Sequence, residues 1–348
     1  MSTKFVRRFL CALALALGLA QLGAAAKPAP LAVPETVPAA AQAVEPAKPS
    51  GAASLRTGAY ITSLYDLNAN NNTFTADLWL WFLHDKAFNL KPLKTLETAN
   101  ARDFRPGVDT VEEHGTERYH AQKVRGVFNH NWDVRNFPFD RHELQIRLEE
   151  GLADIHKIRF VADQANTGFD PQISIEGWNV TKVSIETGEH VYNSSFGLKN
   201  VAGSRYAAST ISIFVERDGL ALFFKLLSAV YIAFMVSIVS FFLDPSKDGL
   251  FNGRVSLSVG MIFAVIINSQ RVAGTLGQTP VFTLADKIHI LTLVAIVFSL
   301  LGALVSRRLH MQGRGDYADS IDRRMAVGMV AVFTAANLLM ILAAAKGG

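Results

Sequence analysis

Cysteine is nearly absent from this sequence of 348 residues, which contains only Cys11. Because Cys11 lies within residues 1–26, which have the pattern of a secretory signal peptide, we expect no disulfide and no cysteine nucleophile in the mature chain. The nine histidines show no HExxH or other tight metal-ligand spacing, and the sequence has neither a GxSxG motif nor a phosphate-binding loop. These absences predict a protein that is not an enzyme and needs no metal or cofactor.

Long runs of one charge sign are also missing. The formal net charge is +4, but no five like charges follow one another, and several arginines flank apolar segments. We therefore do not expect nucleic acid as a partner. The chain is 50% hydrophobic and 18% charged, with a mean hydropathy of +0.22, and its apolar runs gather in the last third. This distribution indicates a soluble part followed by a membrane part.

The N-terminal region has two distinct compositions. Residues 1–26 have a basic start, an apolar centre and small residues at the end, which predicts a signal peptide; the alternative is that residues 9–26 stay as a membrane anchor. Residues 27–53 contain nine alanines and six of the 12 prolines. Few of these side chains can form a core, so residues 27–54 are predicted to be a disordered tether.

Residues 55–218 have the pattern of a β-domain. Short alternating runs are separated by turn residues, and His142–Leu148 is the clearest, with Leu144, Ile146 and Leu148 on one face. A turn is also expected at Thr187 and Gly188. About 160 residues of such strands favour a β-sandwich.

Four apolar segments follow in residues 219–348, with predicted helices at about 220–243, 254–275, 285–306 and 325–345. Each is long enough to cross a bilayer core of roughly 30 Å. Polar residues interrupt the second segment, so this helix should not face lipid on all sides. Five arginines between the third and fourth segments predict a cytoplasmic loop there, with the β-domain and the C-terminus exported. They are Arg307, Arg308, Arg314, Arg323 and Arg324.

Residues 131–144, NWDVRNFPFDRHEL, resemble the signature loop of the pentameric ligand-gated ion channels, or Cys-loop receptors. The resemblance extends over residues 57–345. It implies a homopentamer in a bacterial inner membrane, with the β-domain in the periplasm binding a small ligand between subunits and a pore that conducts inorganic ions. His130 and Leu144 stand where animal receptors have the loop cysteines, as in the prokaryotic branch. The first membrane helix lacks the family's usual proline, which puts the inherited gating motion in question.

The second membrane segment has one face that suits a pore, with polar residues toward its two ends and apolar residues between them. Residues spaced by three and four positions share this face of the helix, and five copies would form rings around an axis. The alternative is that Phe263 and Ile267 only pack against other helices. Arg254 and Arg271 would add positive charge at the two ends, which favours anions. The predicted pore-lining residues are Ser256, Gly260, Phe263, Ile267, Gln270 and Arg271.

The resemblance also implies residues that couple the β-domain to the membrane helices. An ion pair between Asp140 and Arg217 would tie the signature loop to the start of the first helix. The alternative is that Asp140 only caps a turn after Pro138. The predicted coupling residues are Asp133, Phe137, Pro138, Phe139, Asp140, Arg217 and Pro280.

Agonists of the family bind in a box of aromatic side chains, which suits an amine through cation–π attraction. The candidates here are Trp79, Trp81, Tyr119, Phe160, Tyr192, Phe196 and Tyr206, with Phe169 as an alternative to Phe160. Protons are a second candidate stimulus, through His142 and His289. The alternative function is a membrane-anchored periplasmic sensor or assembly module that keeps the fold and passes no ions.

Overall fold

The computed structural model describes residues 51–194, 196–197, 204–276 and 281–347. The predicted signal peptide and most of the predicted tether lie outside these residues, so both stay predictions.

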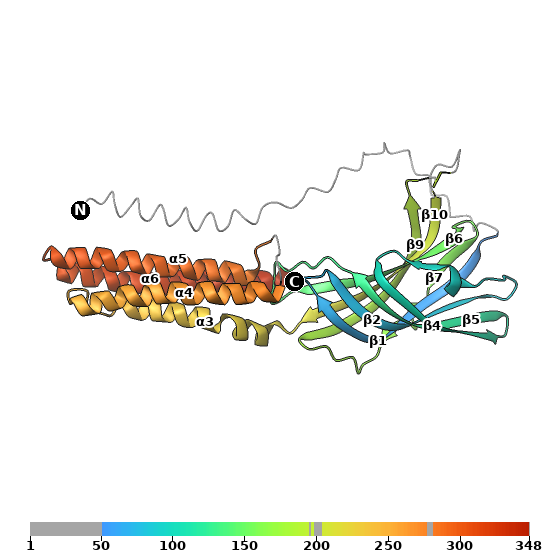
Figure 1. Ribbon diagram of the computed structural model, residues 1–348, viewed down its shortest axis with the longest axis horizontal. Coiled ribbons are helices and arrows are strands. Elements are labelled where there is room, and N and C mark those ends of the chain that lie inside the picture. Colours follow the sequence, from blue (N-terminus) through green and yellow to red (C-terminus); the bar gives the residue numbers. More distant parts are fainter. Residues whose placement is uncertain (1–50, 195, 198–203, 277–280, 348) are drawn as a thin grey trace. The chain divides into compact units, whose positions relative to one another are not determined.

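The described residues form a first sheet of six strands in the β-domain, and Figure 1 shows how its longer strands run beside one another. Strands β4, β5, β2, β1 and β7 follow one another across it, and β8 also pairs with β1. Most neighbours are antiparallel, but β7 and β8 run parallel to β1. The strands are β1 (Ala53–Asn68), β2 (Thr73–Asp85), β4 (Ala101–His114), β5 (Glu117–Asn129), β7 (Ile158–Ala162) and β8 (Gly168–Phe169).

The second sheet has four strands in the order β3, β6, β10 and β9. They are β3 (Leu96–Thr98), β6 (Arg141–Asp154), β9 (Trp178–Tyr192) and β10 (Ser204–Arg217), and the short helix α2 (Pro92–Thr95) precedes β3. The predicted turn at Thr187 and Gly188 is wrong. Strand β9 continues through both residues because β10 pairs with them, Thr187 with Ser209 and Gly188 with Ala208.

The alternating pattern places one face of each sheet in a common core. Leu144, Ile146 and Leu148 of β6 are almost fully buried, and they pack in one cluster with Leu78 and Leu80 of β2. Each of these side chains contributes about 1.5–3 kcal/mol by leaving water. The predicted β-sandwich is confirmed.

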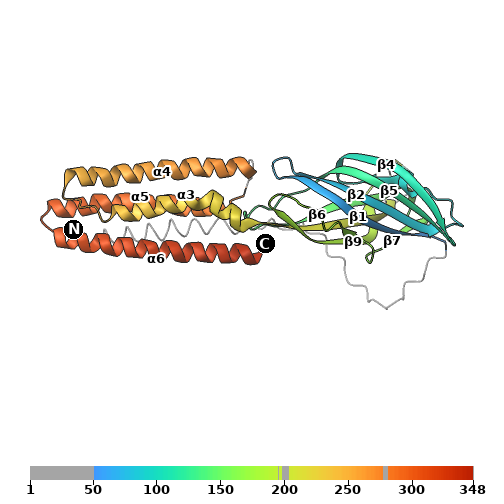
Figure 2. The ribbon, with the colours of Figure 1, turned by 90° about the horizontal axis from the view of Figure 1, so that it is seen from below.

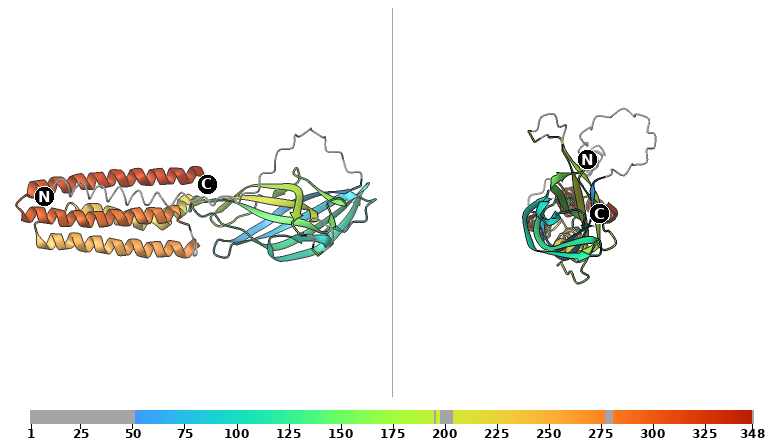
Figure 3. Two further views of the ribbon diagram at one scale, coloured as in Figure 1. Left: turned by 90° about the horizontal axis from the view of Figure 1, so that it is seen from above. Right: turned by 90° about the vertical axis from the view of Figure 1, so that its right-hand side faces the viewer.

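Four helices follow the sandwich and pack side by side (Figures 2 and 3). They are α3 (Gly219–Ser240), α4 (Asp248–Leu276), α5 (Leu284–Met311) and α6 (Gly315–Gly347). All four are long and apolar enough to cross a membrane. Helix α6 begins at Gly315, well before the predicted start at 325. The charged segment that contains Arg323 and Arg324 is therefore part of the helix.

Candidate functional site

The signature loop, residues 131–144, begins after β5 and leads into β6, and its Asp140 forms an ion pair with the end of β10. Arg217 donates from Nε to Oδ1 of Asp140 over 2.7 Å and from Nη2 to Oδ2 over 3.0 Å. The backbone nitrogen of Arg217 also donates to the carbonyl of Asp140 over 3.2 Å. The Asp140 side chain is 1% exposed and that of Arg217 14%. This two-pronged geometry fixes both position and orientation.

A histidine and two aromatic rings complete the surroundings of this pair. Nε2 of His142 lies 2.8 Å from Oδ2 of Asp140, and both side chains are buried. Burial alone would raise the pKa of Asp140, but hydrogen bonds from His142 and Arg217 outweigh it and hold the pKa below its usual value. The Arg217 guanidinium lies 3.9 Å from the ring centre of Trp178 and 5.1 Å from that of Phe137. Cation–π attraction therefore supports the ion pair.

His142 also belongs to a cluster of rings that meet edge to face or tilted and that reach into the core. Trp132 lies 4.7 Å from both His142 and His130 between ring centres, and Trp178 lies 5.8 Å from Trp132. Burial, with the nearby charge of His142, lowers the pKa of His130 to about 4. His130 is therefore neutral at pH 7, and only the His142 side of the cluster contacts a carboxylate.

The tip of the signature loop contacts the start of α3. A Cβ atom added at Gly219 would overlap with the carbonyl oxygen of Pro138 and lie 2.7 Å from Cδ1 of Phe139. The rings of Phe139 and Phe223 lie 5.6 Å apart between centres. Glycine is thus needed at position 219 for the backbone of the loop to approach the helix this closely.

The same loop contacts the start of α5. The backbone nitrogen of Leu284 donates to the carbonyl of Arg135 over 3.0 Å. Thr283 caps α5, because its hydroxyl accepts from the amide of Asp286. The predicted coupling residue Asp133 forms an ion pair with Arg135, which lies in the same loop. The predicted coupling residue Pro280 lies outside the described residues.

Helix α4 has one packed face and one open face in the single chain. Ser258, Val265 and Val272 are almost fully buried and share the packed face. All six predicted pore-lining residues lie on the other side and are exposed, Phe263 to 61% and Ile267 to 69%. The neighbours of α4 are α3 and α5 (Figure 2). A second molecule, lipid or water is needed to cover the open face.

Arg254 does not contribute charge to this open face, which corrects the expectation that it favours anions. Its side chain is 1% exposed, and its Nη1 donates to Oδ2 of Asp322 in α6 over 2.8 Å. Ser306 of α5 donates to the same oxygen over 2.8 Å. Asp322 therefore neutralises the guanidinium inside the helix bundle, and Arg271 is the one charged residue among the six predicted pore-lining residues.

A polar contact inside the bundle holds α4 to its two neighbours. Nδ2 of Asn268 donates to the carbonyl of Leu226 in α3 over 2.8 Å and lies 2.9 Å from Nε2 of His289 in α5. Nδ1 of His289 lies 2.7 Å from the carbonyl of Ala285, so this nitrogen carries the hydrogen. His289 thus accepts from Asn268 when it is neutral, and a second proton would break this hydrogen bond.

Three of the predicted ligand-binding aromatics meet on the second sheet. Tyr192 lies 5.3 Å from Phe196 and 5.9 Å from Tyr206 between ring centres. Beneath them is Glu149, whose residue is 5% exposed. Oε2 of Glu149 accepts from the Tyr192 hydroxyl over 2.9 Å and lies 2.8 Å from Nδ1 of His190. A carboxylate among aromatic rings is suited to a cationic ligand.

The other four candidates lie away from this cluster, on the first sheet. Trp79 and Trp81 are on β2 and Tyr119 is on β5. Trp79 is 40% exposed, whereas Nε1 of Trp81 donates to Asp163 over 3.1 Å. Phe160 is 7% exposed and packs on Phe82, so its ring belongs to the core and is not available to a ligand.

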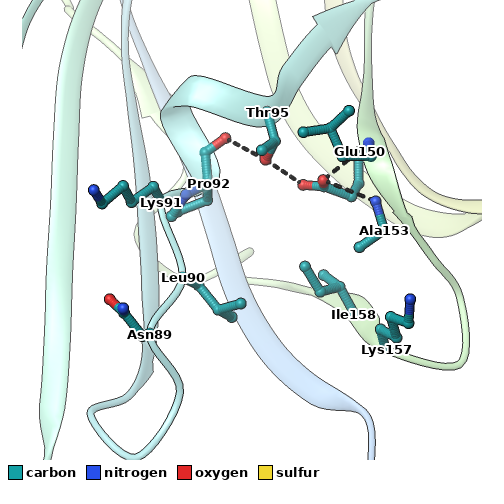
Figure 4. Close-up of a pocket in the computed structure, with 10 residues that line it drawn as sticks. Asn89, Leu90, Lys91, Pro92, Thr95, Glu150, Ala153, Lys157 and Ile158 are labelled. Atoms are coloured by element: carbon teal, nitrogen blue, oxygen red, sulfur yellow. Dashed lines mark hydrogen bonds between the residues drawn. The ribbon is translucent and has the colours of Figure 1, made fainter.

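A pocket of about 320 Å³ lies next to Glu150, as Figure 4 shows. The Glu150 carboxylate accepts from the hydroxyl of Thr95 over 2.7 Å and from the amides of Leu152 and Ala153 over 3.2 and 3.3 Å. These contacts occupy the one carboxylate of the pocket with the chain's own donors, and the rest of the lining includes Lys91 and Lys157 and no aromatic ring. We therefore do not assign a ligand to it.

Sequence reasoning missed several of these residues. Glu149 continues the outward face of β6 after Glu143, Gln145 and Arg147, so the alternation predicts a solvated side chain. Only the pairing of β6 with β10, and of β10 with β9, brings His190 and Tyr192 over it. Trp178 and Asp322 gave no signal beyond their residue types.

We expect the Asp140–Arg217 pair to show strong energetic coupling. The variant Arg217→Glu should destabilise the protein by about 3–5 kcal/mol, because it leaves the buried Asp140 carboxylate beside a like charge. The double variant Arg217→Glu, Asp140→Arg should recover only part of this loss, since the exchanged guanidinium faces His142 and loses the Trp178 ring. Thermal unfolding of the wild type, the two single variants Arg217→Glu and Asp140→Arg, and the double variant measures the coupling energy.

The neighbouring pair Arg141–Glu216 is the matched control. It lies next to the first pair along the chain, between the start of β6 and the end of β10, but its side chains are 58% and 42% exposed. Its charge exchange should give a coupling energy within about 1 kcal/mol. Equal coupling energies for the two pairs would contradict the role given to burial.

We expect Asp322→Asn to destabilise the helix bundle by about 3–5 kcal/mol, because it leaves the buried Arg254 without a counter-ion. Replacing both residues, Arg254→Met with Asp322→Leu, should restore most of the loss. Thermal unfolding in detergent measures both effects. The control is Asp248→Asn, which removes the exposed partner of Arg307 and should cost about 1 kcal/mol or less; a similar cost for Asp322→Asn would refute the prediction.

Comparison with known proteins gives one distant relative. No family model matches the chain. The chain is 23% identical over 192 residues to the acetylcholine receptor subunit alpha-type des-2 of Caenorhabditis elegans. The aligned region covers 55% of this chain and 34% of that protein, so the chain matches about a third of the relative's length. With four candidate membrane-spanning helices, this is a multi-pass membrane protein. The similarity, with a β-sandwich followed by four apolar helices, fits the pentameric ligand-gated ion channel family.

Proposed function

We propose that this chain is the subunit of a ligand-gated ion channel, in which five copies surround a pore lined by α4. A small ligand binds between adjacent β-domains and opens the pore. The channel lies in a bacterial inner membrane, with the β-domain and the C-terminus in the periplasm. Inorganic ions, membrane lipid and the ligand are its partners.

The observation that carries this proposal is the open face of α4. Ser256 and Gln270 are polar, and they share an exposed helix face with Phe263 and Ile267. A face of this kind is poorly suited to lipid at its polar positions, whereas rings of small polar and apolar side chains suit a pore that closes by excluding water.

Strands β9 and β10 provide a route from ligand to pore. Tyr192 and Tyr206 lie at one end of this hairpin, and Trp178 and Arg217 lie at the other. A ligand that moves the aromatic cluster therefore acts on the same two strands that hold Asp140. From Asp140 the signature loop reaches α3 at Gly219 and α5 at Leu284.

The ligand proposed for the aromatic cluster is a small amine. Glu149 supplies a negative charge, and the rings of Tyr192, Phe196 and Tyr206 supply faces that attract a cation. Trp79 and Tyr119 are on the other sheet, so they would complete the site from the adjacent subunit.

A non-conducting sensor with the same fold is the second candidate function. It is favoured by α3, an uninterrupted helix without proline from Gly219 to Ser240, and by the bulk of Phe263 on the proposed pore face. The two functions differ in one measurable property, the current through the purified protein.

We expect Phe263→Ala to increase the leak current, because it removes the largest apolar side chain from the proposed constriction. The measurement is planar-bilayer recording of wild-type and variant proteins in asymmetric salt, across a panel of small amines. The reversal potential then reports whether cations or anions pass.

Phe224→Ala is the matched control, since Phe224 of α3 is also 61% exposed and is not on α4. It should leave the current unchanged. Silence from all three proteins, once mass measurement has established a pentamer, would favour the non-conducting sensor. Equal leak from both variants would show that helix packing, not the pore face, is responsible.

We expect Glu149→Gln to weaken amine binding by about tenfold or more, since a hydrogen bond to a charged group contributes about 1.5–3 kcal/mol. Calorimetric titration of the pentamer with the amine that opens the channel measures the effect. Glu97→Gln is the control, because Glu97 lies opposite Glu149 in the sheet register and is exposed. An equal loss in both variants would mean that general charge, not contact, attracts the ligand.

A further inference from the structure

One histidine connects the buried carboxylate of the aromatic cluster to solvent. The ring of His190 in β9 lies 4.2 Å from that of Tyr192 between centres. Nδ1 of His190 lies 2.8 Å from Oε2 of Glu149. The side chain of His190 is 45% exposed, whereas that of Glu149 is 6% exposed. His190 can therefore take up a proton from water while it contacts the carboxylate.

The contact with Glu149 determines which ring nitrogen of neutral His190 carries the hydrogen. A carboxylate only accepts, so Nδ1 is the donor and Nε2 is bare. The hydroxyl of Tyr192 donates to the same oxygen of Glu149 over 2.9 Å. A second proton on His190 thus goes to Nε2 and disturbs neither hydrogen bond.

This second proton changes the charge of the cluster and leaves its contacts in place. With neutral His190, the carboxylate of Glu149 is the only charge in the group formed by Glu149, His190 and Tyr192. With protonated His190, the imidazolium and the carboxylate form an ion pair, and the group is neutral overall. A cation beside Glu149 then meets a positive charge as well, so its attraction falls.

The other groups around His190 keep their charge near neutral pH. Carboxyl and guanidinium groups ordinarily do so, whereas an imidazole ordinarily titrates there. Burial, with the hydrogen bond to Glu149 and its charge, raises the pKa of Tyr192, so the hydroxyl stays protonated. The surrounding charged groups are Glu97 of β3, Asp154 of β6, Arg159 of β7, Glu189 of β9 and Arg205 of β10, and β8 contributes none.

We propose that His190 regulates the amine site, because a proton on its ring neutralises Glu149 and lowers the affinity for the amine. Protons and the amine then oppose each other at one carboxylate. This inference rests on the proposed amine site and adds the residue that makes binding depend on pH. Affinity is highest above neutral pH and falls as the solution becomes acidic.

Linkage makes the effect reciprocal. If a proton on His190 weakens the binding of a cation, the bound cation disfavours that proton by the same factor. Binding of a cation near pH 6.5 therefore releases protons. This release is a signature that a purely structural role of His190 does not produce.

Calorimetric titration of the full-length pentamer in detergent with tetramethylammonium tests the proposal. This probe suits aromatic rings and has a charge that does not depend on pH. The wild-type affinity should fall by about fivefold from pH 7.5 to pH 5.5, the size expected for a partly exposed charge pair. His190→Gln keeps an N–H donor but takes up no proton, so its affinity should be the same at both pH values.

Proton release is measured at pH 6.5 in two buffers of different ionisation enthalpy. The wild type should release protons on binding, and His190→Gln should not. His190→Lys keeps a positive charge at both pH values, so its affinity should be low throughout. His156→Gln, at an exposed histidine in the turn between β6 and β7, should behave as the wild type.

The outcomes separate this inference from the proposed function. Wild-type affinity that does not change with pH, or an equal loss in acid by His190→Gln, would overturn the role of His190 and leave the amine site intact. Failure of the wild type to bind tetramethylammonium at either pH would overturn the amine site itself, and the role of His190 with it.

Discussion

The contact of Arg217 with Asp140 is the interaction on which the rest of this structure depends. It joins the last residue of the β-domain's final strand to the loop that contacts two membrane helices. Arg217 neutralises the buried carboxylate, and His142 contacts its second oxygen. The rings of Trp178 and Phe137 in turn cover the guanidinium. Because Asp140 is buried and Arg217 is largely shielded from water, the strand end and the loop move together or lose several kcal/mol.

Much of the fold could be predicted from local pattern. Alternation in His142–Leu148 identifies a strand, because burial follows the two-residue period of a strand. Uncharged runs of about 20 residues identify membrane helices, because that length spans a bilayer core. Residue contacts within the site follow less well. Arg254 and Asp322 are 68 positions apart, and nothing near either residue indicates that they meet. The sequence therefore predicts the charge of Arg254 at an open end of the helix, whereas packing buries it against Asp322 of α6.

The burial of Glu149 is a second contact that the local sequence pattern does not predict. Its place on the outward face of β6 predicts solvent, yet the β9–β10 hairpin covers it with His190 and Tyr192. Whether an outward residue becomes buried depends on which strand lies beside it, and this is set by the topology of the whole sheet. The aromatic residues were recognisable by type, but the carboxylate that gives them a chemical preference was not.

The absence of proline from α3 has a mechanical consequence. One residue, Asp218, separates Arg217 from the helix, and the 22 residues of α3 form an uninterrupted rod about 33 Å long. A kinked helix would absorb a tilt imposed at its upper end. A helix without such a break transmits the tilt, so a small rotation at the sheet would reappear as a lateral displacement at the far end of α3.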